Sequence, residues 1–458
     1  MEPIVTPEEM AAVDEAAPEP VEVLIGRAGA AVARHALDVL GGGYAKRVVV
    51  LAGRGNNGAD GRAAATRLGA RGVRCLVVDA TDAPDRLPSA DLVIDAAYGT
   101  GFHGEHHPPR LPDTAPPVLA VDIPSGVSGL TGQAGGEPWS ATRTVTFAAW
   151  KPGLLIGDGP ELAGAVTVAD IGLDASSKAG AHRVTGVDVA DWLPERPRST
   201  HKWRSALWLV AGSPGMTGAA HLATRSAQRG GAGYVRLSTP GSDTDPMAPT
   251  EAVVTPLPAA GWAAEVLDGA ERFSALAVGP GLGTGDDDAA QVRDLVGRSV
   301  APIVVDGDGL KALGEQAGEV VGRRSGDAGP VVLTPHDGEF EALTGEAPGA
   351  DRFTAARDLA ASTGATVLLK GSTTIVAAPD GTTWASTTGG PRLATAGTGD
   401  VLTGLVAALL AQGLDAGRAA VAAAHLHGRA GALAWSRGLV AGDLVDRLPA
   451  AFAELPGG

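Results

Sequence analysis

The chain has 458 residues, 44% of them hydrophobic, so it is long enough for two or three separately folded cores. Its formal net charge of −16 argues against nucleic acid and anionic membranes as partners, because both would be repelled. Cys75 is the one cysteine, which excludes an internal disulfide framework and a cysteine-based zinc site. The sequence opens without an apolar signal segment, and no run reaches the roughly 18 apolar residues of a membrane span. We therefore expect a cytoplasmic protein.

The first part of the sequence alternates short apolar runs with helical patterns. Helices are predicted at residues 22–40 and at Asp60–Arg71. The predicted strands are Arg47–Ala52, Val73–Val78, Asp91–Asp95, Val118–Asp122, Thr144–Ala148 and Ala165–Ala169. Because parallel strands need long crossover connections, this alternation predicts a parallel sheet covered by helices.

The pattern breaks between about Ala175 and Ser205, where small, proline and charged residues dominate. We place a domain boundary there and expect domains at 1–185 and 186–458. A second α/β series follows. Its predicted strands are Ala206–Ala211, Tyr234–Ser238, Ala275–Gly279, Pro302–Asp306, Val331–Thr334, Thr366–Lys370, Ile375–Ala378 and Thr382–Ser386, the last two forming a hairpin. Its predicted helices are Ala219–Arg229, Arg352–Ser362, Asp400–Gln412 and Ala416–Trp435. Each domain is expected to be a three-layer αβα structure.

A glycine-rich loop follows the first predicted strand. Gly53, Gly55 and Gly58 have the G-x-G-x-x-G spacing between a strand and a helix, and Asp79 ends the next strand, where an acidic residue would hold a ribose. A Rossmann oxidoreductase is therefore a first interpretation. Glycines that only shape a tight turn are the alternative.

Polar residues at the strand ends make the signal more specific. The loop carries the oxygen-bearing side chains of Asn56, Asn57 and Asp60. Such amide and carboxylate oxygens suit a hard cation. Asp95 ends a strand ahead of Gly99–Phe102, and Asp122 ends another. Because ligands of open α/β sheets bind at the carboxyl ends of strands, we expect these segments to converge on one crevice. Asp122 can alternatively be a strand-end residue that caps the following turn.

These segments resemble the NAD(P)H-hydrate epimerase family over roughly residues 5–180. The motifs that carry the resemblance are Asn56–Gly61, Asp95 with Gly99–Gly101, and Val121–Gly126. The resemblance implies a Rossmann-like domain in which Asn57, Asp95 and Ser125 bind potassium. It implies hydrate contacts at Asn56, Asn57, Gly58, Ala59, Asp60, Gly99, Thr100, Gly101, Phe102 and Asp122. We assign the acid/base role to Asp122, because a positioned carboxylate can shuttle the proton of the substrate hydroxyl. Ala59 replaces a glycine of the family, which is tolerable if its φ is negative.

The segment Ala394–Asp400 leads directly into a predicted helix. Glycines at a helix N-terminus expose backbone N–H groups, and the helix dipole favours negative charge there, as in a phosphoryl group during transfer. Asp400 at this point can take the proton from an attacking hydroxyl. Simple N-capping of the helix is the alternative, and the two roles are compatible. We favour the catalytic role.

Other polar residues follow further strands of the second half. Lys370–Thr374 can approach phosphates or a nucleoside. His336 and Glu339 stand three residues apart, a spacing that can place both on one helix face. Asp306 and Asp308 can contact magnesium through water or merely solvate a loop.

No G-x-x-x-x-G-K-[ST] P-loop is present, so a nucleotide must be held in another way. The Gly-Thr-Gly-Asp turn resembles the ribokinase-like superfamily and, within it, the ADP- or ATP-dependent NAD(P)H-hydrate dehydratases. The motifs are His201–Trp203, Ala211–Ser213, Met216–Ala220, Gly279–Gly283, Thr334–Phe340, Lys370–Thr374 and Leu393–Asp400, within about residues 190–455. The resemblance implies hydrate contacts at Gly281, His336, Glu339 and Asp400. It implies nucleotide contacts at Lys370, Gly371, Ser372, Thr373, Thr374, Ala396, Gly397, Thr398 and Gly399.

Together the two resemblances imply a bifunctional metabolite repair enzyme. One domain would interconvert the R and S forms of NAD(P)H-hydrate, and the other would dehydrate the S form with ADP and Mg²⁺, giving NAD(P)H, AMP and phosphate. The preference for ADP is implied by the family alone. The expected partners are NAD(P)H-hydrate, ADP and further copies of the chain in a homo-oligomer.

Three other functions were weighed. A ribokinase-like vitamin-precursor kinase with an N-terminal NAD(P)-binding regulatory domain would use the same anion hole and aspartate. A non-catalytic NAD(P)-sensing module is disfavoured, because Asp122 and Asp400 are intact. A Rossmann dehydrogenase comes last, because no fitting catalytic set for hydride transfer is apparent.

Overall fold

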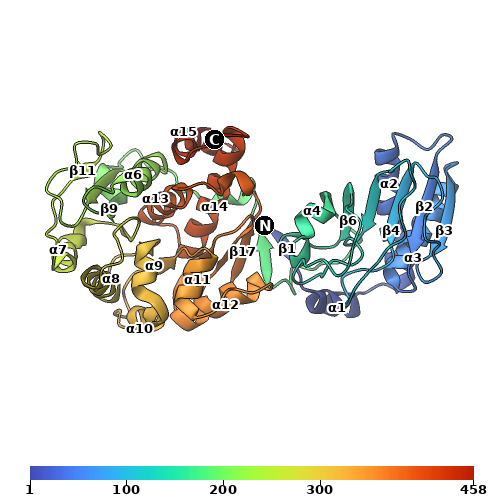
Figure 1. Ribbon diagram of the computed structural model, residues 1–458, viewed down its shortest axis with the longest axis horizontal. Coiled ribbons are helices and arrows are strands. Elements are labelled where there is room, and N and C mark those ends of the chain that lie inside the picture. Colours follow the sequence, from blue (N-terminus) through green and yellow to red (C-terminus); the bar gives the residue numbers. More distant parts are fainter. Residues whose placement is uncertain (458) are drawn as a thin grey trace. The chain divides into compact units, whose positions relative to one another are not determined.

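The computed structural model describes residues 1–457, which form two compact units (Figure 1). One unit spans Glu2–His182, and the other begins at Arg183 and includes Met1. Among the described residues, no helix combines the length and apolarity needed to cross a bilayer.

The first unit is built around a parallel sheet. Its elements are β1 (Glu2–Ile4), α1 (Pro7–Glu15), α2 (Val21–Leu40), β2 (Arg47–Ala52), α3 (Asn56–Gly69), β3 (Arg74–Asp79), β4 (Leu92–Ala96), β5 (Val118–Val121), β6 (Arg143–Phe147), η1 (Pro152–Leu154), α4 (Gly159–Ala163), β7 (Ala165–Ala169) and β8 (Ala181–Arg183), the last at the boundary. Six strands are arranged in the order β3-β2-β4-β5-β6-β7, and all neighbours are parallel. All six predicted strands are confirmed, with ends within one residue of the prediction.

The two faces of this sheet are covered differently. Val48 and Val50 of β2 point to one face and pack with residues of α2 and α3, such as Val32 and Leu68. Val49 points to the opposite face, where irregular segments rather than long helices supply the cover, including Leu87 and Trp139. This alternation follows from the two-residue period of a strand. The irregular segments leave the carboxyl ends of the strands free to hold functional loops.

The second unit contains the larger sheet and most of the helices. Its elements are α5 (Gly186–Trp192), η2 (Lys202–Ser205), β9 (Ala206–Val210), α6 (Gly218–Arg229), β10 (Tyr234–Ser238), β11 (Val253–Val254), α7 (Trp262–Gly269), η3 (Ala270–Arg272), β12 (Ala275–Val278), α8 (Asp286–Arg298), β13 (Ile303–Val305), α9 (Asp308–Leu313), η4 (Gly314–Gln316), α10 (Ala317–Gly322), β14 (Val331–Leu333), α11 (Asp337–Thr344), α12 (Arg352–Thr363), β15 (Thr366–Leu369), β16 (Thr374–Ala377), β17 (Thr383–Ser386), η5 (Pro391–Leu393), α13 (Thr398–Ala411), α14 (Ala416–Leu433) and α15 (Ala441–Ala453).

Strands of this unit follow the order β17-β16-β15-β14-β13-β12-β9-β10-β11. The ladders from β15 to β11 are parallel, and the predicted hairpin β16–β17 is antiparallel. Helices α6, α13, α14 and α15 lie on one face and α7 to α12 on the other (Figure 1). The α/β fold class with parallel sheets is thus confirmed, and this unit has the expected three αβα layers. Helix α15 was not predicted, because Pro449 inside it interrupts the helical pattern.

Candidate active sites

The glycine loop of the first unit is mostly the beginning of a helix. Helix α3 begins at Asn56, four residues before the predicted start, so the Asn pair lies in its first turn. Asparagine and glycine are weak helix formers, and tertiary packing overrides that preference here. A Cβ on Gly58 would lie 1.9 Å from the carbonyl oxygen of Gly53, so the backbone approach itself requires glycine. Ala59 lies inside α3 and is absent from the residues with positive φ, so its methyl group is tolerated.

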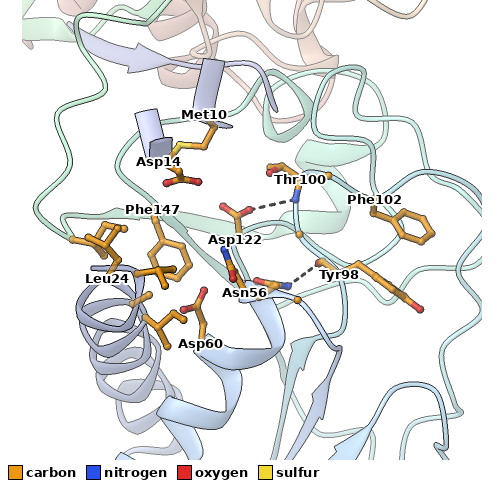
Figure 2. Close-up of a pocket in the computed structure, with 18 of the residues that line it drawn as sticks. Met10, Asp14, Leu24, Asn56, Asp60, Tyr98, Thr100, Phe102, Asp122 and Phe147 are labelled. Carbon is orange, nitrogen blue, oxygen red and sulfur yellow. Dashed lines mark hydrogen bonds between the residues drawn. The ribbon is translucent and has the colours of Figure 1, made fainter. Parts of the chain in front are cut away.

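A cavity of about 730 Å³ lies at the carboxyl ends of β2, β4, β5 and β6 (Figure 2). The predicted hydrate-binding residues that line it are Asn56, Asn57, Asp60, Gly99, Thr100, Gly101, Phe102 and Asp122. Gly58 and Ala59 are not among the lining residues. The predicted convergence of the strand ends on one crevice is therefore observed, and the position of Gly58 is explained by packing.

The opposite wall of the cavity comes from α1 and α2. It includes Met10 and Asp14 of α1 and Leu24 and Ile25 of α2. Figure 2 shows Asp14, Asp60 and Asp122 around the same space. No sequence motif predicts this wall. The amphipathic pattern of residues 22–40 identified a helix, but no local signal indicates which of its side chains meet a ligand.

Asp122 occupies the centre of this site in an unusual backbone conformation. Its φ is +67°, a left-handed value that is uncommon outside glycine. Its Oδ1 lies 3.0 Å from Nζ of Lys151 and accepts a 3.1 Å hydrogen bond from Oγ1 of Thr146. Its Oδ2 is 3.4 Å from the backbone N–H of Thr100. Lys151, with 1% of its surface exposed, was not singled out in the sequence.

The other carboxyl groups of the cavity are poorly solvated. The pKa of Asp60 is raised to about 8, chiefly by burial and in part by the charges of Asp122 and Asp14. Burial also raises the pKa of Asp14. Asp60 is therefore largely protonated at neutral pH, so the cavity holds a proton-bearing carboxyl beside a carboxylate that faces a lysine.

The three predicted potassium ligands come together beneath the cavity. Ser125 donates its hydroxyl to Oδ1 of Asp95 at 2.6 Å and its N–H to Oδ2 at 2.9 Å. Asn57 donates from Nδ2 to the carbonyl of Tyr98 at 2.8 Å, and Ser125 Oγ is 3.2 Å from the same carbonyl. The Asn57 Oδ1 atom is buried without a hydrogen-bond partner among the described residues. A buried amide oxygen without a partner, in a residue that contacts the same carbonyl as Ser125, fits a hard cation.

Asp79 does not belong to this site. It accepts hydrogen bonds from the backbone and side chain of Thr81, lies 3.6 Å from Arg62, and is not among the residues that line the cavity. The ribose contact expected of a Rossmann oxidoreductase therefore finds no support in its position.

The second site lies at the start of α13. The helix begins at Thr398, two residues before the predicted start, and its N-cap is Gly397 with φ +88°. Asp400 therefore lies in the first turn and is not the N-cap, which disfavours the capping alternative. Its pKa is raised to about 7, chiefly by burial; Asp306 contributes to the rise, and Lys370 opposes it. A carboxylate with such a pKa suits a general base at neutral pH.

Below this turn, Lys370 joins two buried carboxylates. Its Nζ lies 2.7 Å from Oδ1 of Asp306 and 3.3 Å from Oε2 of Glu339. Thr334 and Thr403 donate their hydroxyl groups to Asp306 at 2.8 and 2.5 Å. Burial opposes ionisation of Asp306, but Lys370 and these hydrogen bonds outweigh it and lower its pKa. Asp306 is thus an anchored buried anion, not a residue that solvates a loop.

His336 and Glu339 form a reciprocal cap on α11. The Nδ1 atom of His336 accepts hydrogen bonds from the N–H groups of Gly338 and Glu339, and Glu339 accepts one from the N–H of His336 at 2.9 Å. This cap fixes Glu339 beside Lys370. His336 and Glu339, the two predicted substrate residues, therefore lie together next to the Lys370–Asp306 pair.

The remaining predicted contacts lie in neighbouring turns. Gly371–Thr373 connects β15 to β16, and a Cβ on Gly399 would lie 3.5 Å from Nζ of Lys370, so the lysine reaches the start of α13. Gly281, with φ +67°, approaches Gly212. Asp308 accepts from the N–H of Gly283 and pairs with Lys311 at 3.0 Å.

The parallel sheets and their strand-end sites define an α/β enzyme with a Rossmann-like and a ribokinase-like half. A family model described as NAD(P)H-hydrate dehydratase matches residues 207–451, and one described as YjeF-related protein N-terminus matches 21–85 and 77–153. The chain is 37% identical over 472 residues to the bifunctional NAD(P)H-hydrate repair enzyme of Moorella thermoacetica, covering 90% of this chain and 88% of that one. It is 38% identical over 409 residues to that of Mycobacterium tuberculosis, with 83% and 82% covered.

Among solved structures, the second unit is similar to the ADP/ATP-dependent NAD(P)H-hydrate dehydratase of Bacillus subtilis co-crystallised with ATP and Mg²⁺. The identity is 31% with a TM-score of 0.53, covering 60% of this chain and 98% of that one. The chain belongs to the family of bifunctional NAD(P)H-hydrate repair enzymes.

Proposed function

We propose that the chain repairs hydrated NAD(P)H in two steps. Residues 1–185 interconvert the R and S hydrates, and residues 186–458 dehydrate the S form with ADP. The proposal is supported by family membership and by one structural observation above all: Asp400, whose pKa is raised to about 7 chiefly by burial, lies in the first turn of α13, where a helix has backbone N–H groups without an intrahelical partner.

In the epimerisation, the substrate carries a hydroxyl at C6 of a reduced nicotinamide ring. The cavity of the first unit holds the ring, and Asp122 exchanges the hydroxyl proton while the bond at C6 is broken and remade. Asn57, Asp95 and Ser125 would hold a potassium ion, which supplies a fixed positive charge beneath the cavity. The unpaired Oδ1 atom of Asn57 supports this assignment.

In the dehydration, Asp400 removes the proton of the C6 hydroxyl, and its oxygen attacks the terminal phosphoryl group of ADP. Backbone N–H groups at Gly397–Gly399 bind the charge of the transferred group. AMP leaves, and the lone pair of the ring nitrogen expels phosphate from C6. Loss of the proton at C5 then restores NAD(P)H.

Magnesium fits this site as an ion carried largely by the nucleotide. Asp306 is buried and engaged by Lys370, Thr334 and Thr403. Asp308 is held by Lys311, which is half exposed, and by the N–H of Gly283, and it would reach the ion through water. Such a site, with phosphates and few carboxylates, is common for Mg²⁺, which neutralises charge on the phosphates when bound.

The test is an absorbance assay at the reduced-nicotinamide band with a mixture of R and S hydrates, ADP and Mg²⁺. We expect full recovery of NAD(P)H. Recovery of the S fraction alone would refute the epimerase activity, and no recovery would refute the dehydratase activity. A parallel assay with ATP and hydroxymethylpyrimidine or thiazole precursors tests the alternative, a vitamin-precursor kinase with an NAD(P)-binding regulatory domain.

A further inference from the structure

Lys151 is a buried cation for which the mechanism above gives no role. Its Nζ lies 2.8 Å from Oγ1 of Thr146, 2.8 Å from the Phe147 carbonyl, 3.2 Å from the Ala149 carbonyl and 3.0 Å from Oδ1 of Asp122. Burying an ammonium group is costly unless it is paired and hydrogen-bonded, and every one of these contacts lies at the floor of one site.

Two strained turns meet at this ammonium group. Around Asp122, the N–H of Ile123 donates to the carbonyl of Val121 at 2.8 Å. Around Ala148, with φ +62°, the N–H of Ala149 donates to the carbonyl of Phe147 at 2.6 Å. Three-residue turns with a positive φ at the centre are rare and strained, and they persist only where their surroundings enforce them. They follow the neighbouring parallel strands β5 and β6.

Lys151 connects these two turns. It donates to both carbonyls that bound the turn at Ala148, and it contacts the carboxylate at the centre of the other. Thr146 completes the link, because its Oγ1 accepts from Lys151 and donates to Oδ1 of Asp122. The two side chains therefore hold the same carboxylate oxygen.

The other oxygen of Asp122 is left toward the cavity. Within residues 1–457, the one hydrogen-bond contact of Oδ2 is a long one, 3.4 Å, to the N–H of Thr100 (Figure 2). A Cβ on Gly99 would lie 3.3 Å from Oδ2, so glycine at that position keeps the space beside the oxygen open. A substrate hydroxyl entering the cavity thus meets Oδ2 and not Oδ1.

We propose that Lys151 is a positioning residue of the epimerase site: with Thr146 it anchors Oδ1 of Asp122 and the two strained turns, so that Oδ2 alone exchanges the proton of the C6 hydroxyl. The inference rests on the proposed epimerase function. Its competitor is a purely structural role, in which Lys151 only ties the backbone together.

Thr146 offers a matched pair of variants. Thr146→Val keeps the shape of the side chain but removes its hydroxyl, whereas Thr146→Ser keeps the hydroxyl. We expect Thr146→Val to lower kcat for R-to-S interconversion roughly tenfold with KM within about twofold, and Thr146→Ser to restore kcat to within about threefold of the unchanged protein. Lys151→Met should lower kcat at least about a hundredfold.

Interconversion is measured by chromatographic separation of the two hydrates. Turnover of pure S hydrate with ADP normalises the protein concentration through the second unit, and thermal melting checks that the first unit is folded. Equal kcat values for Thr146→Val and Thr146→Ser, or a change in KM alone, would overturn the proposal. If thermal melting shows that Lys151→Met does not fold, the Thr146 pair decides. The proposed function and the role of Lys151 fail in different ways. If the unchanged protein does not interconvert the hydrates, the proposed epimerase function is refuted. If Asp122→Asn abolishes interconversion but Lys151→Met and Thr146→Val do not lower it, the role of Lys151 is refuted.

Discussion

Each of the two sites contains a candidate catalytic aspartate and a buried lysine, but the contacts between them differ. In the first unit, the carboxylate of Asp122 contacts Lys151 directly, at 3.0 Å. In the second, Lys370 is taken up by Asp306 and Glu339, at 2.7 and 3.3 Å, so its charge is largely neutralised before it acts on Asp400. Burial then dominates and raises the pKa of Asp400 to about 7. Contact with Lys151 therefore fixes the position of Asp122, whereas burial sets the pKa of Asp400.

This difference matches two kinds of proton transfer. A carboxylate anchored at one oxygen offers the other in a fixed direction, which suits repeated exchange with one hydroxyl. A carboxyl group with a pKa near neutrality is a stronger base once ionised, which suits activation of an alcohol for attack on phosphorus. The following changes test this distinction.

The largest effect is expected from Asp400→Asn. The amide cannot accept the hydroxyl proton, so kcat for dehydration of the S hydrate should fall by about 10³–10⁴-fold, while R-to-S interconversion stays unchanged. The two activities are measured on the same preparation. Asp294→Asn, at a half-buried position of α8 where the side chain pairs with Arg298, is the control and should retain both activities. A loss below tenfold in Asp400→Asn would show that another group is the base.

Lys370→Met tests the buried cluster of the second unit. Removing the cation leaves Asp306 and Glu339 buried without a counter-charge, so the free energy of unfolding of this unit should fall by about 3–5 kcal/mol. Urea denaturation measures the change. Lys311→Met removes a lysine that is half exposed and paired with Asp308, and it should cost at most about 1 kcal/mol. If Lys370→Met and Lys311→Met lowered the free energy of unfolding equally, Lys370 would not be the counter-charge that stabilises Asp306 and Glu339.

The pH dependence of dehydration follows from the raised pKa of Asp400. The base must be unprotonated, so kcat should fall as the pH drops through about 7, approaching tenfold per pH unit below it. Initial rates at saturating hydrate and ADP between pH 6 and 9 measure this limb. A rate independent of pH down to 6 would mean that Asp400 titrates as an ordinary aspartate when substrates are bound.

The smallest effect is expected from Asp79→Asn. Asp79 lies outside the cavity and is bonded to Thr81, so both activities should stay within about twofold of the unchanged protein. Steady-state kinetics with NADH and NADPH hydrates check this result. A marked rise in KM would revive the dinucleotide-binding interpretation of the G-x-G-x-x-G loop.

Much of the fold follows from local pattern. Strands such as Arg47–Ala52 are apolar runs that end at glycine or aspartate, and buried parallel strands have that appearance. The residue at which a helix begins is less predictable from local pattern than a strand is. The start of α3 at Asn56 is an example, because it is set by close packing of Gly58 on Gly53 and not by helix propensity.

The site was predictable only where it sits at strand ends. Asp95 lies near the end of β4, Asp122 follows β5, and Asp400 lies in the first turn of α13, so topology alone brings them to the functional edge of a sheet. Asp14 and Lys151 reach the first cavity from segments far from its motifs. Nothing in the residues around them indicates that position, because tertiary packing places them.

The helical conformation of Ala59 helps to decide whether a relative with substitutions in this loop keeps a functional first site. Since the position is an ordinary helical one, exchange between glycine and alanine there requires no change of backbone, and such drift says nothing about lost activity. Position 58 is different, because any side chain would collide with the preceding strand end. A homologue with a larger residue at the equivalent of Gly58 is therefore the one to suspect of having a decayed first site.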